Sequence, residues 1–358
     1  QDDVITGFID AVSERALNPK EIDKNVSIVY TPLNGTGRYC VTRCLKENGY
    51  TQITIPKEQE MPDGNFTTCP YPNPEIREAL EVGLKKAKEV GSDLLLATDP
   101  DCDRVGVAVK EGDDYQLISG NQMGILLFDY ICKTYKANGT MPENPVVVTT
   151  IVSTKMIDKI AADYGVEVRR VLTGFKFIGE QIGFLEADGE VDRYIFGFEE
   201  SYGYLSGGHV RDKDGVNASL LICEMFAHYK AMGISLVQML NQLYEKYGYF
   251  KEALQSITFE GASGAKKMAD LMESLRTNAP KEVAGYKVID VKDYKAGIGN
   301  LPKSNVLEFN MEDDINVLVR PSGTEPKIKM YYLVKGSSEQ AGAKIAAGLE
   351  SYFTVVCK

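Results

Sequence analysis

The feature that most constrains this chain is a cluster of acidic residues placed directly after an apolar run. The apolar run is Leu94-Leu95-Leu96-Ala97, and it leads into Asp99-Pro100-Asp101-Cys102-Asp103-Arg104. A short apolar run bounded by turn residues predicts a buried strand. Polar groups at the carboxyl end of such a strand are typical of the ligand sites of α/β sheets. The sequence therefore predicts an α/β fold with a site at residues 99–104.

Three carboxylates at alternate positions beside a guanidinium favour a divalent cation. Mg²⁺ takes oxygen ligands and is often held by carboxylates and substrate phosphates, and an adjacent arginine can bind phosphate. We therefore predict that Asp99, Asp101 and Asp103 are metal ligands. A solvated acidic turn and a phosphatase loop with Asp99 as nucleophile remain alternatives. A calcium loop of the EF-hand type is excluded, because Arg104 and Lys110 replace its required glycine and glutamate.

Composition narrows the class of protein. The 358 residues suggest more than one domain, and no apolar run is long enough to span a bilayer. The net charge of −11 argues against a nucleic-acid partner. The seven cysteines are scattered without a Cys-x-x-Cys pair, which predicts neither disulfides nor zinc and favours a cytoplasmic location. A first residue of Gln1 suggests that the sequence begins inside a longer polypeptide.

The order of apolar runs and helical patterns predicts two α/β domains with mixed sheets and a smaller C-terminal α+β domain. We expect a linker helix at 1–24, an α/β domain with the metal-binding loop at 25–140, and an α/β domain with a sugar-binding loop at 141–249. The α+β domain, with a phosphate-binding loop, is expected at 250–358. Gly35 and Gly37 are interpreted as a tight turn, because Cys40 stands where a dinucleotide-binding motif needs glycine.

Three further segments contain candidate binding or catalytic residues. Glu199-Glu200-Ser201 follows a predicted strand, and its oxygens are suited to binding sugar hydroxyls, although a polar turn is the simpler alternative. Lys213, in Arg211-Asp212-Lys213-Asp214-Gly215, could have a lowered pKa opposite a metal and act as a general acid or base. The segment from Arg320 to Lys327, with its hydroxyls and Gly323, predicts an anion-binding turn.

In this order, the acidic loop, the Glu199-Glu200-Ser201 loop and the 320–327 loop resemble those of the phosphoglucomutase/phosphomannomutase (α-D-phosphohexomutase) family. The similarity continues through Thr173-Gly174-Phe175-Lys176 and through residues 211–215. The resemblance implies a four-domain, Mg²⁺-dependent enzyme that moves phosphate between the 1 and 6 positions of a hexose. The reaction would pass through a phosphoserine and a bisphosphorylated hexose, which also acts as activator, and glucose phosphates are the expected substrates.

The resemblance also implies roles for individual residues. Asp99, Asp101 and Asp103 would hold Mg²⁺, and Arg104 would lie near the phosphoserine. Lys213 would be the general acid or base, with His209 as the alternative. The expected substrate contacts are Lys176, Glu199, Ser201, Arg211, Arg320, Ser322, Gly323, Thr324 and Lys329.

The Ser-His-Asn-Pro loop that carries the phosphoserine in this family is absent. The sequence has only two histidines, and His209 precedes Val210 while His228 precedes Tyr229. We therefore expect that the chain holds domains two to four, that its partner is a missing N-terminal domain of the same polypeptide, and that it is inactive alone. Cys102 and Phe198 are smaller departures from the family pattern. A non-catalytic sugar-phosphate-binding protein and a phosphatase that uses an aspartate nucleophile remain alternatives.

Overall fold

The computed structural model describes residues 2–18, 22–261, 263–323 and 325–357. Contacts divide the chain into two units. The first unit comprises Gln1–Thr150 and Ile157–Gln242, and the second comprises Ile151–Met156 and Leu243–Lys358. The four domain ranges expected from the sequence stay predictions.

The first unit contains a mixed sheet of five strands. They are β1 (Ile28–Thr31), β2 (Ile53–Thr54), β3 (Leu94–Thr98), β4 (Val105–Glu111) and β5 (Asp114–Ile118), in the order β2-β1-β3-β4-β5. β1 runs parallel to β2 and β3, whereas β4 and β5 continue the sheet in antiparallel fashion. Every residue of β3 is buried, as expected for an apolar strand covered on both faces.

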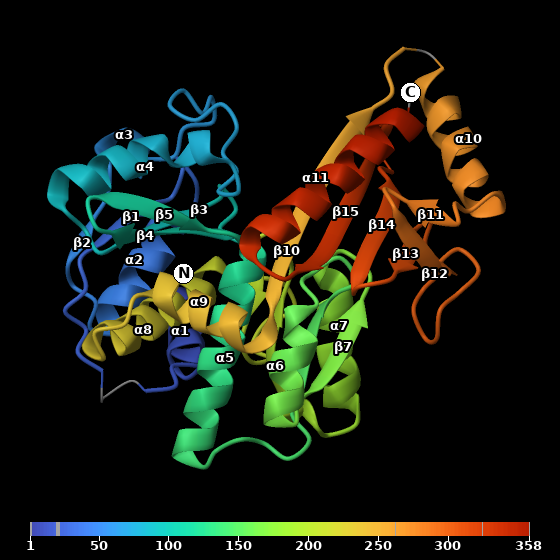
Figure 1. Ribbon diagram of the computed structural model, residues 1–358. Helices are drawn as coiled ribbons and strands as arrows, with labels where there is room; N and C mark the ends of the chain where they lie inside the picture. Colours follow the sequence, from blue (N-terminus) through green and yellow to red (C-terminus); the bar gives the residue numbers. More distant parts are fainter. Residues whose placement is uncertain (1, 19–21, 262, 324, 358) are drawn as a thin grey trace. The chain divides into compact units, whose positions relative to one another are not determined.

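Helices cover both faces of this sheet. The helices are α2 (Gly37–Glu47), α3 (Lys57–Glu60), α4 (Arg77–Val90) and α8 (Gly215–Ala231). α4 packs against β1 and β3, and Figure 1 shows α2 and α8 on the opposite face. The predicted central strand is therefore confirmed, and its carboxyl end leads directly into the acidic loop.

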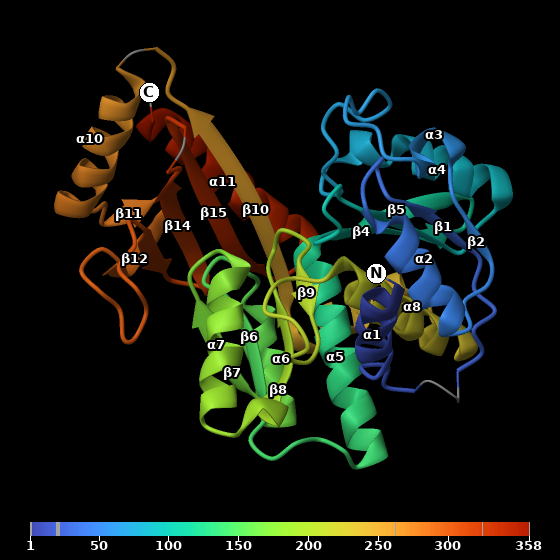
Figure 2. The same cartoon turned by 180° about the vertical axis from the view of Figure 1, so that it is seen from behind.

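The first unit also contains a four-stranded sheet. Its strands are β6 (Val146–Thr150), β7 (Glu167–Val171), β8 (Tyr194–Phe198) and β9 (Tyr204–Leu205), in the order β7-β6-β8-β9. The surrounding helices are α5 (Gly120–Asn138), α6 (Met156–Tyr164), α7 (Phe175–Ala187) and the short 3₁₀ helix η1 (Val191–Arg193). β6 lies parallel to both β7 and β8. In Figure 2, α6 and α7 lie on opposite faces of this sheet, which is the layered α/β arrangement expected from the sequence.

The helix predicted for residues 1–24 is shorter in the structure. α1 (Asp2–Ser13) ends after three turns. The buried carboxylate of Glu224 on α8 accepts hydrogen bonds from the backbone N–H of Leu17, with both oxygens 3.1 Å from the nitrogen. A distant side chain thus takes up a backbone donor that a continuing helix would have bonded internally.

The second unit is built on an antiparallel sheet of six strands. They are β10 (Tyr249–Thr258), β11 (Glu282–Val283), β12 (Tyr286–Asp293), β13 (Leu307–Met311), β14 (Ile315–Pro321) and β15 (Lys327–Gly336), in the order β10-β15-β14-β13-β12-β11. The helices of this part are α10 (Gly264–Thr277) and α11 (Glu339–Val356), and α9 (Leu236–Tyr247) crosses from the first unit into the second. α11 packs along β10 and β15 and buries Leu349 and Phe353 in the core (Figure 1). The predicted fold class is confirmed.

Among the described helices, none is by itself long and apolar enough to cross a membrane. Only α8 and α9 taken together reach the required length and composition, and they are bent by 87° relative to each other. The cytoplasmic location stays a prediction.

Candidate active site

The acidic loop at the end of β3 is held by its own first carboxylate. Asp99 is 1% exposed, and its Oδ1 accepts hydrogen bonds from the backbone N–H groups of Asp103 (3.0 Å) and Arg104 (2.9 Å). Bonds of this kind between an aspartate and the following backbone stabilise tight turns. Cys102 has a φ of 62°, a left-handed conformation, so the loop turns sharply between Asp101 and Asp103.

The turn gathers the three predicted metal ligands. One carboxylate oxygen from each of Asp99, Asp101 and Asp103 lies within 4.8 Å of the others. The pKa of Asp103 is raised to about 6, chiefly by burial and also by the Asp99 carboxylate, although the hydrogen bond from Lys213 acts to lower it. Such crowding of carboxylates is costly without a positive charge, and oxygen donors are the ligands that Mg²⁺ prefers. The residues present therefore fit the cation that the family resemblance implies.

Two cationic side chains lie against these carboxylates. The Arg104 Nε is 2.6 Å from Asp99 Oδ2, and the Lys213 Nζ is 2.6 Å from Asp103 Oδ2. Arg104 also donates from Nη1 to Glu75 Oε1 at 2.9 Å and to Asn73 Oδ1 at 3.3 Å. Glu75 was missed by sequence reasoning, because it lies in a proline-rich loop whose letters give no sign that it faces Arg104.

The pKa of Lys213 is governed by its contact with Asp103. Burial acts to lower the pKa of Lys213, but the hydrogen bond and the charge of Asp103 outweigh it, so that the pKa is raised. The lowered pKa expected from the sequence applies to a lysine opposite a bound metal, and it stays a prediction.

The start of α8 brings Lys213 to the acidic loop. Asp214 caps this helix, its Oδ1 accepting from the backbone N–H groups of Val216 (2.8 Å) and Asn217 (3.2 Å). The next residue, Gly215, donates its N–H to the carbonyl oxygen of Cys102 at 3.0 Å. A Cβ at Gly215 would come within 2.5 Å of that oxygen, so the contact requires glycine. Lys213 thus lies one residue before the cap of a helix whose first residue is bonded to the acidic loop.

The loop after β8 adjoins the same site. Arg104 and Gly203 form an isolated β-bridge, and the Val105 N–H donates to the Tyr202 carbonyl at 3.0 Å. Glu199 is 6% exposed and accepts a hydrogen bond from the backbone N–H of Gly174 at 2.7 Å. Burial, followed by the charge of Glu200, raises the pKa of Glu199 to about 7. The acidic loop, the Glu199 loop and Lys213 therefore lie together, although they are far apart in the chain.

The remaining predicted residues of this unit have other partners. His209 is 8% exposed at its side chain, and its Nε2 lies 3.0 Å from Asp214 Oδ2. Arg211 pairs with Glu186 at 2.7 Å, and the Lys176 Nζ lies 4.9 Å from the centroid of the Phe177 ring. Of the described candidates for acid/base chemistry, Lys213 and not His209 contacts the carboxylates of the acidic loop.

The predicted phosphate loop lies in the second unit, between β14 and β15. Arg320 and Lys329 are directly opposite each other in the register of the two strands, and both are partly exposed. The Ser322 N–H donates to the Lys327 carbonyl at 2.7 Å, which closes the turn before the exposed Gly323. Like charges at opposed positions are unfavourable unless an anion offsets them. Thr324 was also predicted to bind phosphate, and it lies outside the described residues.

Comparisons with known proteins agree on one family. Residues 6–112 match phosphoglucomutase/phosphomannomutase alpha/beta/alpha domain II, and residues 119–247 match domain III of the same family. A phosphoglucomutase of Staphylococcus aureus (strain MRSA252) is 35% identical over 323 residues, which are 87% of this chain and 57% of that protein. A probable phosphomannomutase of Haemophilus influenzae is 33% identical over 349 residues, covering 97% of this chain and 67% of that protein. The chain spans little more than half the length of the Staphylococcus relative.

Solved structures share the fold. The open form of the phosphoglucomutase parafusin from Paramecium aligns with a TM-score of 0.68 and 18% identity, covering 98% of this chain and 61% of that one. A putative phosphomannomutase from Thermus thermophilus aligns with a TM-score of 0.64 and 22% identity, covering 96% of this chain and 66% of that one. The converging loops, the two matched domains and these relatives lead to one conclusion: the chain belongs to the phosphoglucomutase/phosphomannomutase family.

Proposed function

We propose that this chain supplies the metal, sugar and phosphate loops of a phosphohexomutase that interconverts hexose 1-phosphate and hexose 6-phosphate, with glucose as the preferred hexose. The observation that carries the proposal is the convergence of Asp99, Asp101 and Asp103 with Lys213 and the Glu199 loop in one unit. Phosphoryl transfer depends chiefly on positioning and on offsetting negative charge, and these residues supply both.

Each group has a role in this proposal. Asp99, Asp101 and Asp103 hold Mg²⁺, which would offset the charge of the transferring phosphoryl group. Arg104 is oriented by Asp99 and Glu75 to contact the same group. Lys213 gives a proton to, or takes it from, the reacting sugar oxygen.

The remaining roles concern the substrate. Glu199 and Ser201 bind sugar hydroxyls, and Lys176 and Arg211 are further contacts. The second unit binds the phosphate that is not being transferred, through Arg320, Ser322, Gly323, Thr324 and Lys329. A bisphosphorylated hexose is the intermediate and the activator.

The phosphoserine of the proposed reaction comes from residues outside this sequence. The Ser-His-Asn-Pro motif is absent from the 358 residues. Without a nucleophile, the covalent route that divides the transfer into two steps is closed. We therefore expect the chain alone to bind hexose phosphates but not to convert them.

Phosphorus NMR of glucose 1-phosphate tests the proposal. We expect no conversion with this chain, and conversion to glucose 6-phosphate with a longer polypeptide that restores the Ser-His-Asn-Pro domain. Rapid conversion by this chain alone would contradict the missing-nucleophile proposal. Release of inorganic phosphate, abolished in Asp99→Asn, would indicate the phosphatase, and binding without conversion by the longer polypeptide would indicate a non-catalytic binding protein.

A further inference from the structure

Two buried threonines at the end of β6 hold the loop that follows β8. Thr149 and Thr150 are both 0% exposed. The Thr149 Oγ1 donates to the Phe198 carbonyl at 2.9 Å, and the Thr150 Oγ1 donates to Glu200 Oε2 at 3.0 Å. Threonine is branched at Cβ, so its hydroxyl is restricted to few orientations. The residues on both sides of Glu199 are thus bonded to the neighbouring strand.

The two neighbouring carboxylates of this loop have different partners. Glu199 accepts a hydrogen bond from the backbone N–H of Gly174, the residue before α7, whereas Glu200 accepts one from the Thr150 hydroxyl. Hydrogen bonds to a carboxylate are stronger than those between neutral groups, so each bond fixes the direction of its side chain. Glu199 therefore lies toward the segment that contains Lys176, a proposed substrate contact, and Glu200 lies toward β6.

The backbone of Glu200 is held as well. A Cβ added at Gly120, the first residue of α5, would lie 2.1 Å from the Glu200 carbonyl oxygen, so this close approach requires glycine. α5 is itself fixed at this end by a capping box between Ser119 and Gln122. Both the side chain and the backbone of Glu200 are therefore held by secondary structure, which keeps the geometry of a binding site in place before a ligand arrives.

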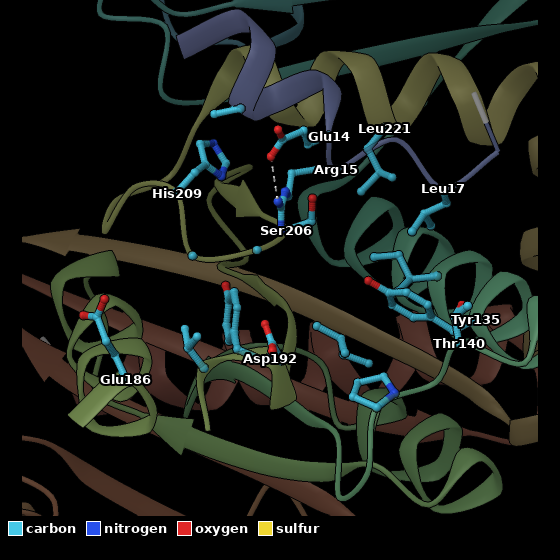
Figure 3. Close-up of a pocket in the computed structure, with 18 residues that line it drawn as sticks. Glu14, Arg15, Leu17, Tyr135, Thr140, Glu186, Asp192, Ser206, His209 and Leu221 are labelled. Carbon is cyan, nitrogen blue, oxygen red and sulfur yellow. Dashed lines mark hydrogen bonds and ion pairs between the residues drawn. The ribbon is translucent and has the colours of Figure 1, made fainter. Parts of the chain in front are cut away.

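The loop lies apart from the cavity shown in Figure 3. That cavity, of about 430 Å³, is lined by Asp192 before β8 and by the first two residues of the strand, whereas the loop follows the last residue of β8. Neither Thr150 nor Glu200 is among the residues that line the cavity. A substitution of Asp192 therefore changes an acidic residue at the other end of the strand and leaves the anchors of the loop in place.

We propose that Glu200, anchored by Thr150, is a positioning residue that keeps Glu199 directed toward the hydroxyl groups of a hexose. Glu200 does not contact the sugar in this proposal and acts through Glu199. The inference rests on the proposed function, because it takes Glu199 to be a sugar contact. A displaced carboxylate binds a hydroxyl poorly, since a hydrogen bond weakens steeply as its distance and angle depart from the preferred values.

Amide NMR of the ligand-free chain tests the position of Glu199. The Gly174 N–H is bonded to Glu199 Oε1 at 2.7 Å, so its proton chemical shift reports where that carboxylate lies. We expect this shift to change in Glu200→Ala and in Thr150→Val, and to change less in Glu200→Gln, whose amide oxygen can still accept from Thr150. Both substitutions of Glu200 remove its negative charge, so the difference between them reports the hydrogen bond. Asp192→Ala is the control and should leave the Gly174 shift unchanged.

Isothermal titration calorimetry of the chain with glucose 6-phosphate tests the consequence for binding. We expect Glu200→Ala and Thr150→Val each to weaken binding about tenfold, the usual scale for one lost hydrogen bond to a charged group, and Glu200→Gln to stay within about twofold of the parent. Glu199→Ala removes the proposed sugar contact itself and should weaken binding at least as much as Glu200→Ala. Inorganic phosphate has no sugar hydroxyl groups, so its affinity should be the same in all of these variants.

Several results would overturn the proposal. An unchanged Gly174 shift in Glu200→Ala and Thr150→Val would show that Glu200 does not position Glu199. Equal losses of affinity in Glu200→Gln and Glu200→Ala would exclude the hydrogen bond as the cause, and equal losses for glucose 6-phosphate and inorganic phosphate would indicate general damage to the structure. If Glu199→Ala loses affinity while Glu200→Ala keeps it, the role of Glu200 fails and the proposed function stands. If the parent chain binds no glucose 6-phosphate, the proposed function fails and the sugar role of Glu200 fails with it.

Discussion

The Nζ of Lys213 lies 2.6 Å from Oδ2 of Asp103, an oxygen of a proposed metal ligand. An ammonium in this position and a divalent cation compete for the same carboxylate, and each repels the other. The acidic loop is therefore stabilised by side-chain cations in the structure described here. A metal bound at Asp103 would therefore weaken the contact between Lys213 and this carboxylate.

The first prediction is that Lys213→Ala raises the affinity of the chain for Mg²⁺ or Mn²⁺ by about tenfold, corresponding to roughly 1.4 kcal/mol of removed competition. Isothermal titration calorimetry with Mn²⁺ on the isolated chain measures this change. Lys176→Ala is the matched control, since its Nζ lies over the Phe177 ring, and it should leave the dissociation constant unchanged. Unchanged or weaker binding in Lys213→Ala would contradict the competition.

The second prediction concerns the pH dependence of stability through Glu199. Burial, with the charge of Glu200, raises the pKa of Glu199 to about 7 from an ordinary value of 4.5. Between these two pH values the folded state binds more protons than the unfolded state, so the free energy of unfolding falls as pH rises. The destabilisation is complete above the folded pKa and disappears below the unfolded one.

Glu199→Gln removes this ionisation and can keep an oxygen acceptor for the Gly174 N–H. At pH 8 we expect the variant to be more stable than the parent by up to about 3 kcal/mol, and at pH 4.5 the difference should vanish. Urea unfolding at the two pH values measures it, with Glu78→Gln on the exposed face of α4 as control. A stability gain of equal size at both pH values would exclude ionisation as its cause.

The sequence predicted the parts of the site that depend on local pattern. An apolar run followed by alternating carboxylates was sufficient for β3 and for the loop, because both result from neighbouring residues. Glu75 could not be found in this way, since it lies 29 residues before Arg104 and pairs with it only in the folded chain. The length of α1 was also overestimated, and the segment after its end is bonded to Glu224, which is 207 residues from Leu17.

The different positions of His209 and Lys213 show a further limit of sequence reasoning. The family resemblance implied Lys213 as the acid/base group, with His209 as the alternative. In the structure Asp214 takes His209 as its partner while it caps α8, and Lys213 extends to Asp103. The contact that each side chain of this loop makes depends on where α8 begins. The spacing of residues in the sequence does not specify that position.

The third prediction concerns the contact between the acidic loop and α8. A Cβ at Gly215 would lie 2.5 Å from the Cys102 carbonyl oxygen, and the Gly215 N–H bonds to that oxygen. Gly215→Ala should therefore displace the loop, destabilise the chain by about 1–3 kcal/mol, and weaken Mn²⁺ binding. Gly183→Ala in α7 is the control, because a Cβ there meets nothing within 4 Å and alanine favours helix. Thermal unfolding and Mn²⁺ titration should both distinguish the two variants, and similar behaviour of the two would rule out the steric explanation.

The fourth prediction concerns the anion-binding turn of the second unit. Arg320 on β14 and Lys329 on β15 are directly opposed, and like charges in this arrangement cost up to about 1 kcal/mol. Arg320→Gln should therefore slightly raise the melting temperature in phosphate-free buffer. Inorganic phosphate should stabilise the parent chain, and this gain should be largely lost in the variant, so that the order of stability reverses as phosphate is added. Lys335 lies on β15 with Lys329 but is paired with Asp314, so the control variant Lys335→Gln should keep the phosphate-dependent gain in stability. A gain of equal size in Arg320→Gln would show that phosphate binds elsewhere in the chain.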